Sequence, residues 1–441
     1  MFALPVQDIA ICPGAVPRER YILHSDMNCF YAAVECFINP AFRDSPVVVG
    51  GNEEARHGIV LAKNLLAKAS GIKTGEPLWE ARNKCPELIV VPPNYRLYMH
   101  YSEQARKIYY DYSDLVEPFG PDEAWTDITG TVYQYGGGAT AAKLIAEEIS
   151  ERVKSELGIS VSIGISWNKV FAKFGSDYKK PDAITVVDRE NYKELVWTAP
   201  VEDLLYVGPA TKKKLYRCGV ITIGDLATYP TAALRARLGK MGEIIQGFAR
   251  GLDTTPVKAL DPERSAVDYV VKSIGNGLTA PRDLKTPADA KALVYLLSES
   301  VAARLREHKL KARAVGIGVR DSELERYTRQ RRLLLPTNIT TEIARAAFAL
   351  LCENEDFEGR GLRSLSIRAQ DLVDAAAPTQ TNLFLPEAQR KKLEELEGSI
   401  DSLRTRFGNK SVVRGIELID SCMAKVDIKS DNTVHPVGYF R

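Results

Sequence analysis

Three carboxylates stand at the ends of predicted strands that lie far apart in the chain. Asp26 closes a short apolar strand, and Asp122 and Glu123 form the tip of a hairpin whose strands are 115–119 and 123–128. Strand ends that are distant in sequence meet only when both strands join one sheet. The chain must therefore fold around a sheet that brings three acids to one edge.

The three acids together predict a divalent cation between them. Carboxylates within a few Å raise one another's pKa, so grouping them is costly unless a cation neutralises them. Oxygen ligands with open positions suit Mg²⁺ held jointly by protein and phosphate. Two such ions activate an attacking oxygen and stabilise a leaving one. The alternative interpretation is that each acid is simply solvated at its strand end, which is the ordinary case for a single aspartate.

The rest of the pattern predicts an α+β, multidomain protein, since 441 residues correspond to about two to four domains. Strands and helices alternate over 20–185, short helices follow over 188–256, and a polar linker is predicted at 257–268. Residues 269–373 have the order β-α-β-β-α-β, with helices at 287–307 and 340–352 and a strand at 314–319 between them. A charged helix is predicted at 386–404.

Composition excludes several classes of protein. Lys and Arg number 59 against 57 Asp and Glu, a net charge of +2, which rules out a histone-like binder. No apolar run approaches the ~20 residues of a membrane helix, and the N-terminus lacks a secretory pattern. Seven scattered cysteines without a C-x-x-C pair predict reduced thiols and a cytoplasmic protein without a membrane segment.

Three longer motifs resemble those of one family. The segments 24–35 (HSDMNCFYAAVE), 120–129 (GPDEAWTDIT) and 162–181 (SIGISWNKVFAKFGSDYKKP) are similar to the active-site motifs of the Y-family, or translesion, DNA polymerases. Their order and spacing match over residues 20–385, most like the bacterial members. Three long motifs in order are a specific signal, far more so than any one of them.

The resemblance implies a fold of palm, small fingers, helical thumb with a helix-hairpin-helix, and a β-α-β-β-α-β little-finger domain. The implied boundaries are a leader at 1–19, the palm at 20–45 and 96–187, the fingers at 46–95, the thumb at 188–256, the linker at 257–268, the little finger at 269–373, and a tail at 374–441 with a clamp-binding peptide.

The resemblance also implies roles for the site residues. Asp26, Asp122 and Glu123 match the catalytic metal ligands, with the backbone carbonyl of Met27 as a further ligand. Tyr31 matches the steric gate, a ring that clashes with a 2′-hydroxyl. The implied nucleotide-binding residues are Phe30, Lys68 and Lys180. Without the motifs, Tyr31 would be an ordinary core aromatic and the lysines would be solvated.

Three basic or exposed segments are interpreted as contacts with macromolecules. The first is the turn and helix with Gly208, Lys212 and Lys213, which has the form of a phosphate-holding hairpin. The second is the basic stretch 304–332, where Arg331 and Arg332 are predicted to bind DNA, the alternative being a solvated face. The third resembles a peptide that docks on a sliding clamp, through Gln380, Leu383 and Phe384.

The expected activity is low-fidelity, template-directed DNA synthesis across damage, by two-metal transfer from a dNTP to the primer 3′-hydroxyl. The expected cofactor is Mg²⁺, two ions, with Mn²⁺ as a substitute. The expected partners are primer–template DNA, dNTP and a sliding clamp, and the protein is expected to be monomeric.

Three departures from the family pattern bear on this activity: Asn28 replaces a second aspartate, Leu65 replaces a tyrosine that contacts the triphosphate, and Trp167 is unusual beside Asn168. Two alternatives remain open. A nucleotide cyclase also places metal-binding acids on a palm-like sheet, and a noncatalytic DNA- or clamp-binding subunit is expected if the departures at Asn28 and Leu65 have disabled the chemistry.

Overall fold

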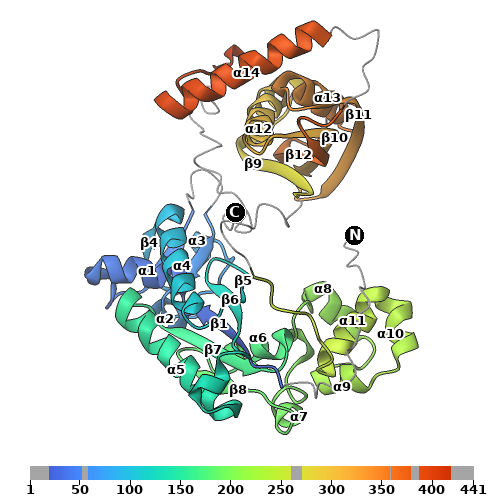
Figure 1. Ribbon diagram of the computed structural model, residues 1–441. Coiled ribbons are helices and arrows are strands. Elements are labelled where there is room, and N and C mark those ends of the chain that lie inside the picture. Colours follow the sequence, from blue (N-terminus) through green and yellow to red (C-terminus); the bar gives the residue numbers. More distant parts are fainter. Residues whose placement is uncertain (1–18, 52–57, 260–270, 358, 379–386, 419–441) are drawn as a thin grey trace.

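The computed structural model describes residues 19–51, 58–259, 271–357, 359–378 and 387–418. Three β-sheets and a run of short helices organise these residues (Figure 1). Nearly all of the predicted leader, most of the predicted linker and the whole predicted clamp-binding peptide lie outside them. Within the described ranges, no helix is long and apolar enough to span a membrane.

The first sheet carries the predicted carboxylates and has five strands in the order β5-β6-β1-β7-β8. The central strand β1 is antiparallel to both β6 and β7, whereas β8 is parallel to β7. All residues of β1 and β7 are buried, as expected for strands covered on both faces. The strands are β1 (Ile22–Met27), β5 (Val116–Pro118), β6 (Glu123–Asp127), β7 (Val161–Ser166) and β8 (Ile184–Val186).

Helices cover both faces of this sheet. On one face, α1, α4 and α5 pack against Leu23 and Ile163, and α6 packs on the other. Because side chains alternate along a strand, Asp26 lies on the face opposite to Leu23, toward α6. The helix approaches closely because β7 has Gly164, where an added Cβ would lie 1.9 Å from the Ala172 carbonyl oxygen. The helical elements are α1 (Phe30–Ile38), α4 (Tyr95–Tyr110), η2 (Val132–Tyr135), α5 (Gly138–Leu157) and α6 (Lys169–Tyr178).

A second, three-stranded sheet lies in residues 40–91, in the order β3-β2-β4. Val48, Val60, Leu78 and Leu88 belong to its small buried core. The elements are η1 (Pro40–Phe42), β2 (Val47–Gly50), β3 (Val60–Lys63), α2 (Leu65–Ala69), α3 (Leu78–Lys84) and β4 (Ile89–Val91).

Residues 188–256 form short helices and no strand, as predicted, with one isolated bridge between Pro200 and Thr222. Trp167 and Phe171 of the α6 region enter the same hydrophobic cluster as these helices, which therefore pack against the first sheet's α6. The elements are α7 (Tyr192–Leu195), η3 (Val201–Asp203), α8 (Pro209–Tyr216), α9 (Ile223–Thr228), α10 (Thr231–Leu238) and α11 (Lys240–Ala249).

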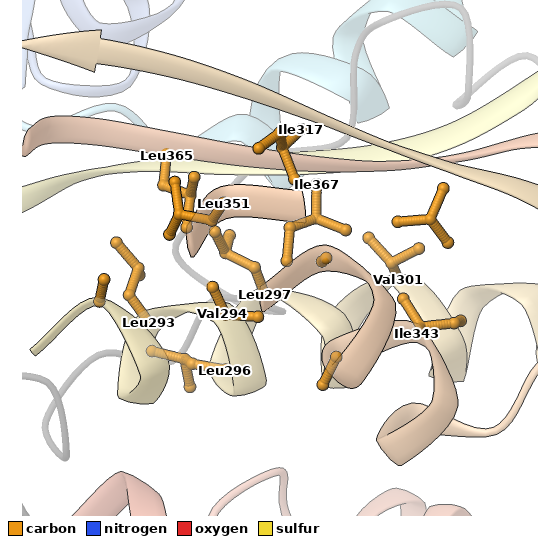
Figure 2. Packing of buried hydrophobic residues seen from close by; sticks show 14 of the residues in the cluster. Leu293, Val294, Leu296, Leu297, Val301, Ile317, Ile343, Leu351, Leu365 and Ile367 are labelled. Atoms are coloured by element: carbon orange, nitrogen blue, oxygen red, sulfur yellow. The ribbon is translucent and has the colours of Figure 1, made fainter. Parts of the chain in front are cut away.

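The third sheet confirms the predicted order β-α-β-β-α-β, and its strands lie side by side as β11-β10-β12-β9. Two helices pack on one face of it, where Leu297, Val301 and Ile343 meet Ile317 and Ile367 of the strands (Figure 2). The elements are β9 (Ser273–Leu284), α12 (Pro287–Glu307), β10 (Leu310–Asp321), β11 (Arg326–Thr337), α13 (Thr340–Cys352) and β12 (Leu362–Asp374).

The chain ends, as described, with α14 (Glu387–Phe407) and η4 (Gly415–Leu418), which dock on α12 and α13 mainly through charged groups. Arg306 of α12 forms a two-pronged pair with Asp401, at 2.6 and 2.9 Å. Arg390 pairs in the same way with Glu342, and the Glu397 side chain is only 4% exposed. Buried charges persist only when they are matched in this way.

Candidate active site

The pairing of β1 with β6 brings the three predicted carboxylates together. Asp26 lies directly opposite Glu123 in the antiparallel register, and the Met27 N–H donates to the Asp122 carbonyl oxygen at 3.0 Å. Opposed residues of an antiparallel pair point to the same face. The tip of the hairpin therefore presents its acids beside the end of β1, as the sequence predicts.

The environment of these acids separates their proton affinities. Burial raises the pKa of Asp26 to about 7, with Lys180 opposing and Glu123 adding to the rise. Burial and Glu123 raise the pKa of Asp122 to about 6. For Glu123, the effect of burial is outweighed by His24 and Lys173, which lower its pKa to about 2. Full ionisation of the group therefore requires additional positive charge.

Cationic and imidazole groups already surround the acids. Lys180 Nζ lies 2.6 Å from Asp26 Oδ2 and 2.7 Å from Asp177 Oδ1, and Lys173 Nζ lies 2.6 Å from Glu123 Oε2. The fully buried His24 has Nε2 3.3 Å from the same Glu123 oxygen, and burial lowers the pKa of His24 to about 4. The ring is therefore neutral at pH 7.

The donor set matches a hard divalent cation. It consists of three carboxylates and a backbone carbonyl, all oxygen, which is the chemistry that Mg²⁺ prefers. In the part of the chain that the structure describes, no three His, Cys, Asp or Glu side chains stand ready as a metal site. Lys180 instead pairs with Asp26, and Lys173 pairs with Glu123. The residues thus fit such an ion, provided that its charge replaces that of the lysines at these oxygens.

A cavity of about 410 Å³ opens beside the acids and gathers every predicted catalytic and nucleotide-binding residue. It is lined from the end of β1, the start of α1, the β3–α2 region, the hairpin tip and the turn after α6. The predicted residues in its lining are Asp26, Met27, Phe30, Tyr31, Lys68, Asp122, Glu123 and Lys180. Such a concave, charged cavity can hold a phosphorylated ligand between acids and lysines.

Tyr31 is held against a buried aromatic neighbour. Its ring stacks on that of Tyr98 with centroids 4.3 Å apart and planes inclined by 14°. The Tyr98 hydroxyl donates to Glu35 Oε1 at 2.6 Å, and the Tyr98 side chain is completely buried. The stack leaves Tyr31 little freedom to swing away from the cavity.

The lining of the cavity also includes residues that sequence reasoning missed. Lys63 and Thr74 line it and are joined by a 3.0 Å hydrogen bond from Nζ to Oγ1. Lys68 is positioned by α2, whose N-terminus is capped by the Asn64 side chain accepting from the Ala67 N–H. Leu65 also lines the cavity with its side chain half exposed. The sequence feature that could have identified Lys63 is its place at the end of the apolar strand β3.

Two of the three departures have a structural account. Asn28 Oδ1 accepts from the Ser162 hydroxyl at 2.9 Å and its Nδ2 donates to Ser160 at 3.1 Å, so its side chain joins β1 to β7. Trp167 Nε1 donates to the Gly251 carbonyl at 3.0 Å and its ring packs edge-on to Phe171. Trp167 therefore fastens α6 to the end of α11.

The predicted DNA-binding residues of the helical unit lie at the start of α8. Gly208 is the exposed N-cap residue, and Lys213 points to solvent. Lys212 is instead engaged within the protein, because its Nζ lies 2.5 Å from Glu202 Oε1. Its charge is therefore partly compensated, which the local run of lysines did not indicate.

The two arginines predicted to bind DNA lie on opposite faces of the third sheet. Arg331 lies opposite the buried Val315, so it points to the helix side of the third sheet, where it pairs with Glu353. Arg332 lies on the other face with its side chain 82% exposed. Neighbouring residues of a strand point to opposite faces, so the two arginines do not share one surface.

The face of the third sheet that α12 and α13 leave uncovered is shallow and basic. Gly316 and Gly318 of β10 lie on this face, opposite Arg368 and Ser366 of β12, so β10 adds no side chain at these two positions. The arginines at strand positions of this face are Arg320, Arg326, Arg332 and Arg368. Sequence reasoning found the charge but not its division between two faces.

Comparisons with known proteins agree with this geometry. Residues 25–177 match the model of the impB/mucB/samB family, and residues 271–383 match the model of that family's C-terminal domain. Relatives named DNA polymerase IV include one from Acetivibrio thermocellus, 49% identical over 92% of this chain and 100% of the relative. Another, from Moorella thermoacetica, is 36% identical over 91% of this chain and 97% of the relative.

A solved structure of a Y-family DNA polymerase chimera shares the fold. It superposes with a TM-score of 0.70 and covers 80% of this chain and 99% of its own, at 19% sequence identity.

Proposed function

The chain belongs to the impB/mucB/samB family and is a Y-family DNA-directed DNA polymerase, and from that premise we propose that it extends primers across damaged DNA with low fidelity. The transfer proposed is from a dNTP to the primer 3′-hydroxyl, with release of pyrophosphate. The observation that carries the proposal is the register of β1 and β6, which opposes Asp26 to Glu123 beside Asp122.

We propose that Asp26, Asp122, Glu123 and the Met27 carbonyl hold two Mg²⁺ ions, for which Mn²⁺ substitutes. Bound there, the ions supply Lewis-acid activation of the 3′-hydroxyl and neutralise charge at the reacting phosphate. The protein's own part is to keep the carboxylates ionised and aligned. Before any cation is bound, Lys173 and His24 lower the pKa of Glu123 through contacts of 2.6 and 3.3 Å to one oxygen, so this carboxylate is already ionised.

The lysines and the aromatic residues of the cavity are proposed to bind different parts of the dNTP. Lys180, which pairs with Asp26 at 2.6 Å in this arrangement, would bind the triphosphate. Lys68 contributes a second positive charge from α2. Phe30 and Tyr31 lie under the sugar, and the Tyr31 ring, fixed by its stack on Tyr98, excludes a 2′-hydroxyl.

We propose that the uncovered basic face of the third sheet and the start of α8 track the DNA backbone. Arg332 and Arg368 supply charge while small residues between them allow close approach. In the family's terms, the first sheet is then the palm, residues 46–95 the fingers, the helical unit the thumb, and the third sheet the little finger. Gly208 and Lys213 mark the thumb's phosphate contact.

The remaining parts of the proposal concern the setting of the enzyme. Gln380, Leu383 and Phe384 are proposed to dock on a sliding clamp, although they lie outside the described residues. The protein is proposed to act as a monomer in the cytoplasm, where its DNA substrate lies.

The test is primer extension on templates with and without an abasic site, using purified protein, Mg²⁺ and single dNTPs. The proposal expects template-directed addition, frequent misinsertion and extension past the lesion. A protein that binds primed DNA without adding nucleotides would instead be a noncatalytic subunit. Release of pyrophosphate from a nucleotide without a primer would indicate a cyclase.

A further inference from the structure

The segment that leaves α11 runs beside β5 and β6 of the first sheet (Figure 1), and three contacts hold it there. Arg20 Nη2 donates to the Thr255 carbonyl oxygen at 3.0 Å. Val257 is only 3% exposed and packs in a small cluster with Trp125. The Lys258 N–H then donates to Glu117 Oε2 at 2.8 Å. Three contacts within four residues thus fix this part of the chain.

Glu117, which accepts from the Lys258 N–H, belongs to the hairpin that carries Asp122 and Glu123. It lies on β5, directly opposite Trp125 of β6. Both of its oxygens lie 2.7 Å from Lys169 Nζ, and Lys169 in turn stands 4.5 Å above the Trp125 ring. Trp125 Nε1 donates to the Lys169 carbonyl at 2.9 Å. One carboxylate therefore joins the hairpin, the start of α6 and the segment that leads to the third sheet.

We propose that Glu117 is a positioning residue that sets where the C-terminal DNA-holding sheet sits relative to the polymerising site. The inference rests on the proposed function, because it concerns how primed DNA is held against the carboxylates. Residues 253–272 join the helical unit to the third sheet in sequence, so a contact at Lys258 holds the chain at a defined distance along the sequence from that sheet. Glu117 fixes it to the same hairpin that carries Asp122 and Glu123.

A purely local role is the competing explanation. Glu117 could serve only to neutralise Lys169 and stiffen β5 against β6. The two roles differ in what they disturb: a loosened hairpin misplaces the acids and slows the chemical step, whereas a released segment weakens the hold on DNA. Separating KM for DNA from the rate at saturating DNA therefore decides between them.

The experiment compares Glu117→Ala, Glu117→Gln and the wild type, with Glu103→Ala as a control. Glu103 forms an exposed ion pair with Lys107 on α4. Its replacement by alanine therefore removes the same charge at a place that does not contact the segment. Amide hydrogen exchange at Lys258 reports the contact itself, and single-nucleotide extension reports its consequence. The Gln side chain keeps an oxygen that can accept from the Lys258 N–H. Glu117→Gln should therefore resemble the wild type in amide exchange at Lys258 and in KM for DNA.

In Glu117→Ala we expect rapid exchange at Lys258 and a KM for primer–template DNA raised about tenfold, the loss typical of one charge-assisted hydrogen bond. The rate at saturating DNA should stay within about twofold of the wild type. Unchanged exchange, or a lower saturating rate at unchanged KM, would overturn the inference. If the wild type extends no primer, the proposed function fails, while exchange at Lys258 still decides whether Glu117 holds the segment.

Discussion

At the scale of single residues, the site depends on side chains whose neighbours leave them one conformation. The carboxylates were predictable from sequence because their motifs and strand ends are local features. The supports were not: Tyr98 under Tyr31, or Ser162 holding Asn28, join positions that only the folded sheet brings together. Lys212 shows the reverse case, since a basic run predicted a free charge that Glu202 in fact neutralises.

Tyr31→Ala should admit ribonucleotides, because the proposed barrier is the volume of the ring. We expect the preference for dNTP over rNTP to fall by at least about tenfold, the scale of a lost steric contact worth 1.4 kcal/mol. The measurement is kcat/KM for matched dNTP and rNTP. Tyr31→Phe is the control, and it should keep the preference because the ring remains. An unchanged ratio in Tyr31→Ala would place the gate elsewhere.

At the scale of elements, the periodicity of apolar residues predicted helices 287–307 and 340–352 with the observed bounds. The strand predicted at 314–319 extends over Leu310–Asp321, because the outer residues pair through their backbones whatever their side chains. Strand pairing also decides on which face of the sheet Arg331 lies. A count of charged residues along the sequence does not give that pairing, so it could not predict the face. Trp167 had no sequence account because its partner, Gly251, belongs to another unit.

Trp167→Ala should loosen the contact between α6 and the helical unit. The buried indole packs on Phe171 and donates to Gly251, so we expect a loss of about 3–5 kcal/mol in the free energy of unfolding. Chemical denaturation measures it. Trp79→Ala is the control, since that tryptophan is 63% exposed and should cost little. Equal losses in the free energy of unfolding for the two variants would show that Trp167 does not stabilise the contact between α6 and the helical unit.

At the scale of the whole molecule, separate units are joined by a few polar contacts that sequence periodicity does not reveal. The C-terminal helix is the clearest example. The sequence predicted a charged helix at 386–404 and gave no partner for it, whereas α14 docks through its charged side chains and leaves Leu396, Leu403 and Phe407 exposed. Such docking depends on matched pairs, which a single sequence cannot align.

Arg306→Ala should release α14 from the third sheet's helices. It would leave Asp401 without its partner and remove one of the two arginines that pair with the buried Glu397, and losing one member of a buried pair costs about 3–5 kcal/mol. Amide exchange across α14 should rise sharply. Arg360→Ala, which removes an exposed pair with Glu323, is the control and should leave α14 protected. Protection of α14 in Arg306→Ala would contradict the account.

Leu383→Ala combined with Phe384→Ala should leave synthesis on short primed DNA unchanged and abolish stimulation by a loaded clamp. Two apolar side chains that fill a pocket contribute about 1.5–3 kcal/mol each, so docking should weaken by orders of magnitude. Extension on a circular template, with and without clamp, measures the effect. Equal stimulation of variant and wild type would reduce this peptide to a connecting segment.

The central claim is that the acids at the β1–β6 junction perform nucleotidyl transfer, and Asp122→Asn tests it most directly. The substitution keeps the size of the side chain and removes the charge, so the fold and the DNA-contacting faces should remain. The measurement is single-nucleotide primer extension at saturating Mg²⁺, with DNA binding followed by fluorescence anisotropy. Asp114→Asn, at an exposed position before β5, is the matched control. The account predicts extension at background with DNA binding intact, and substantial turnover in Asp122→Asn would contradict it.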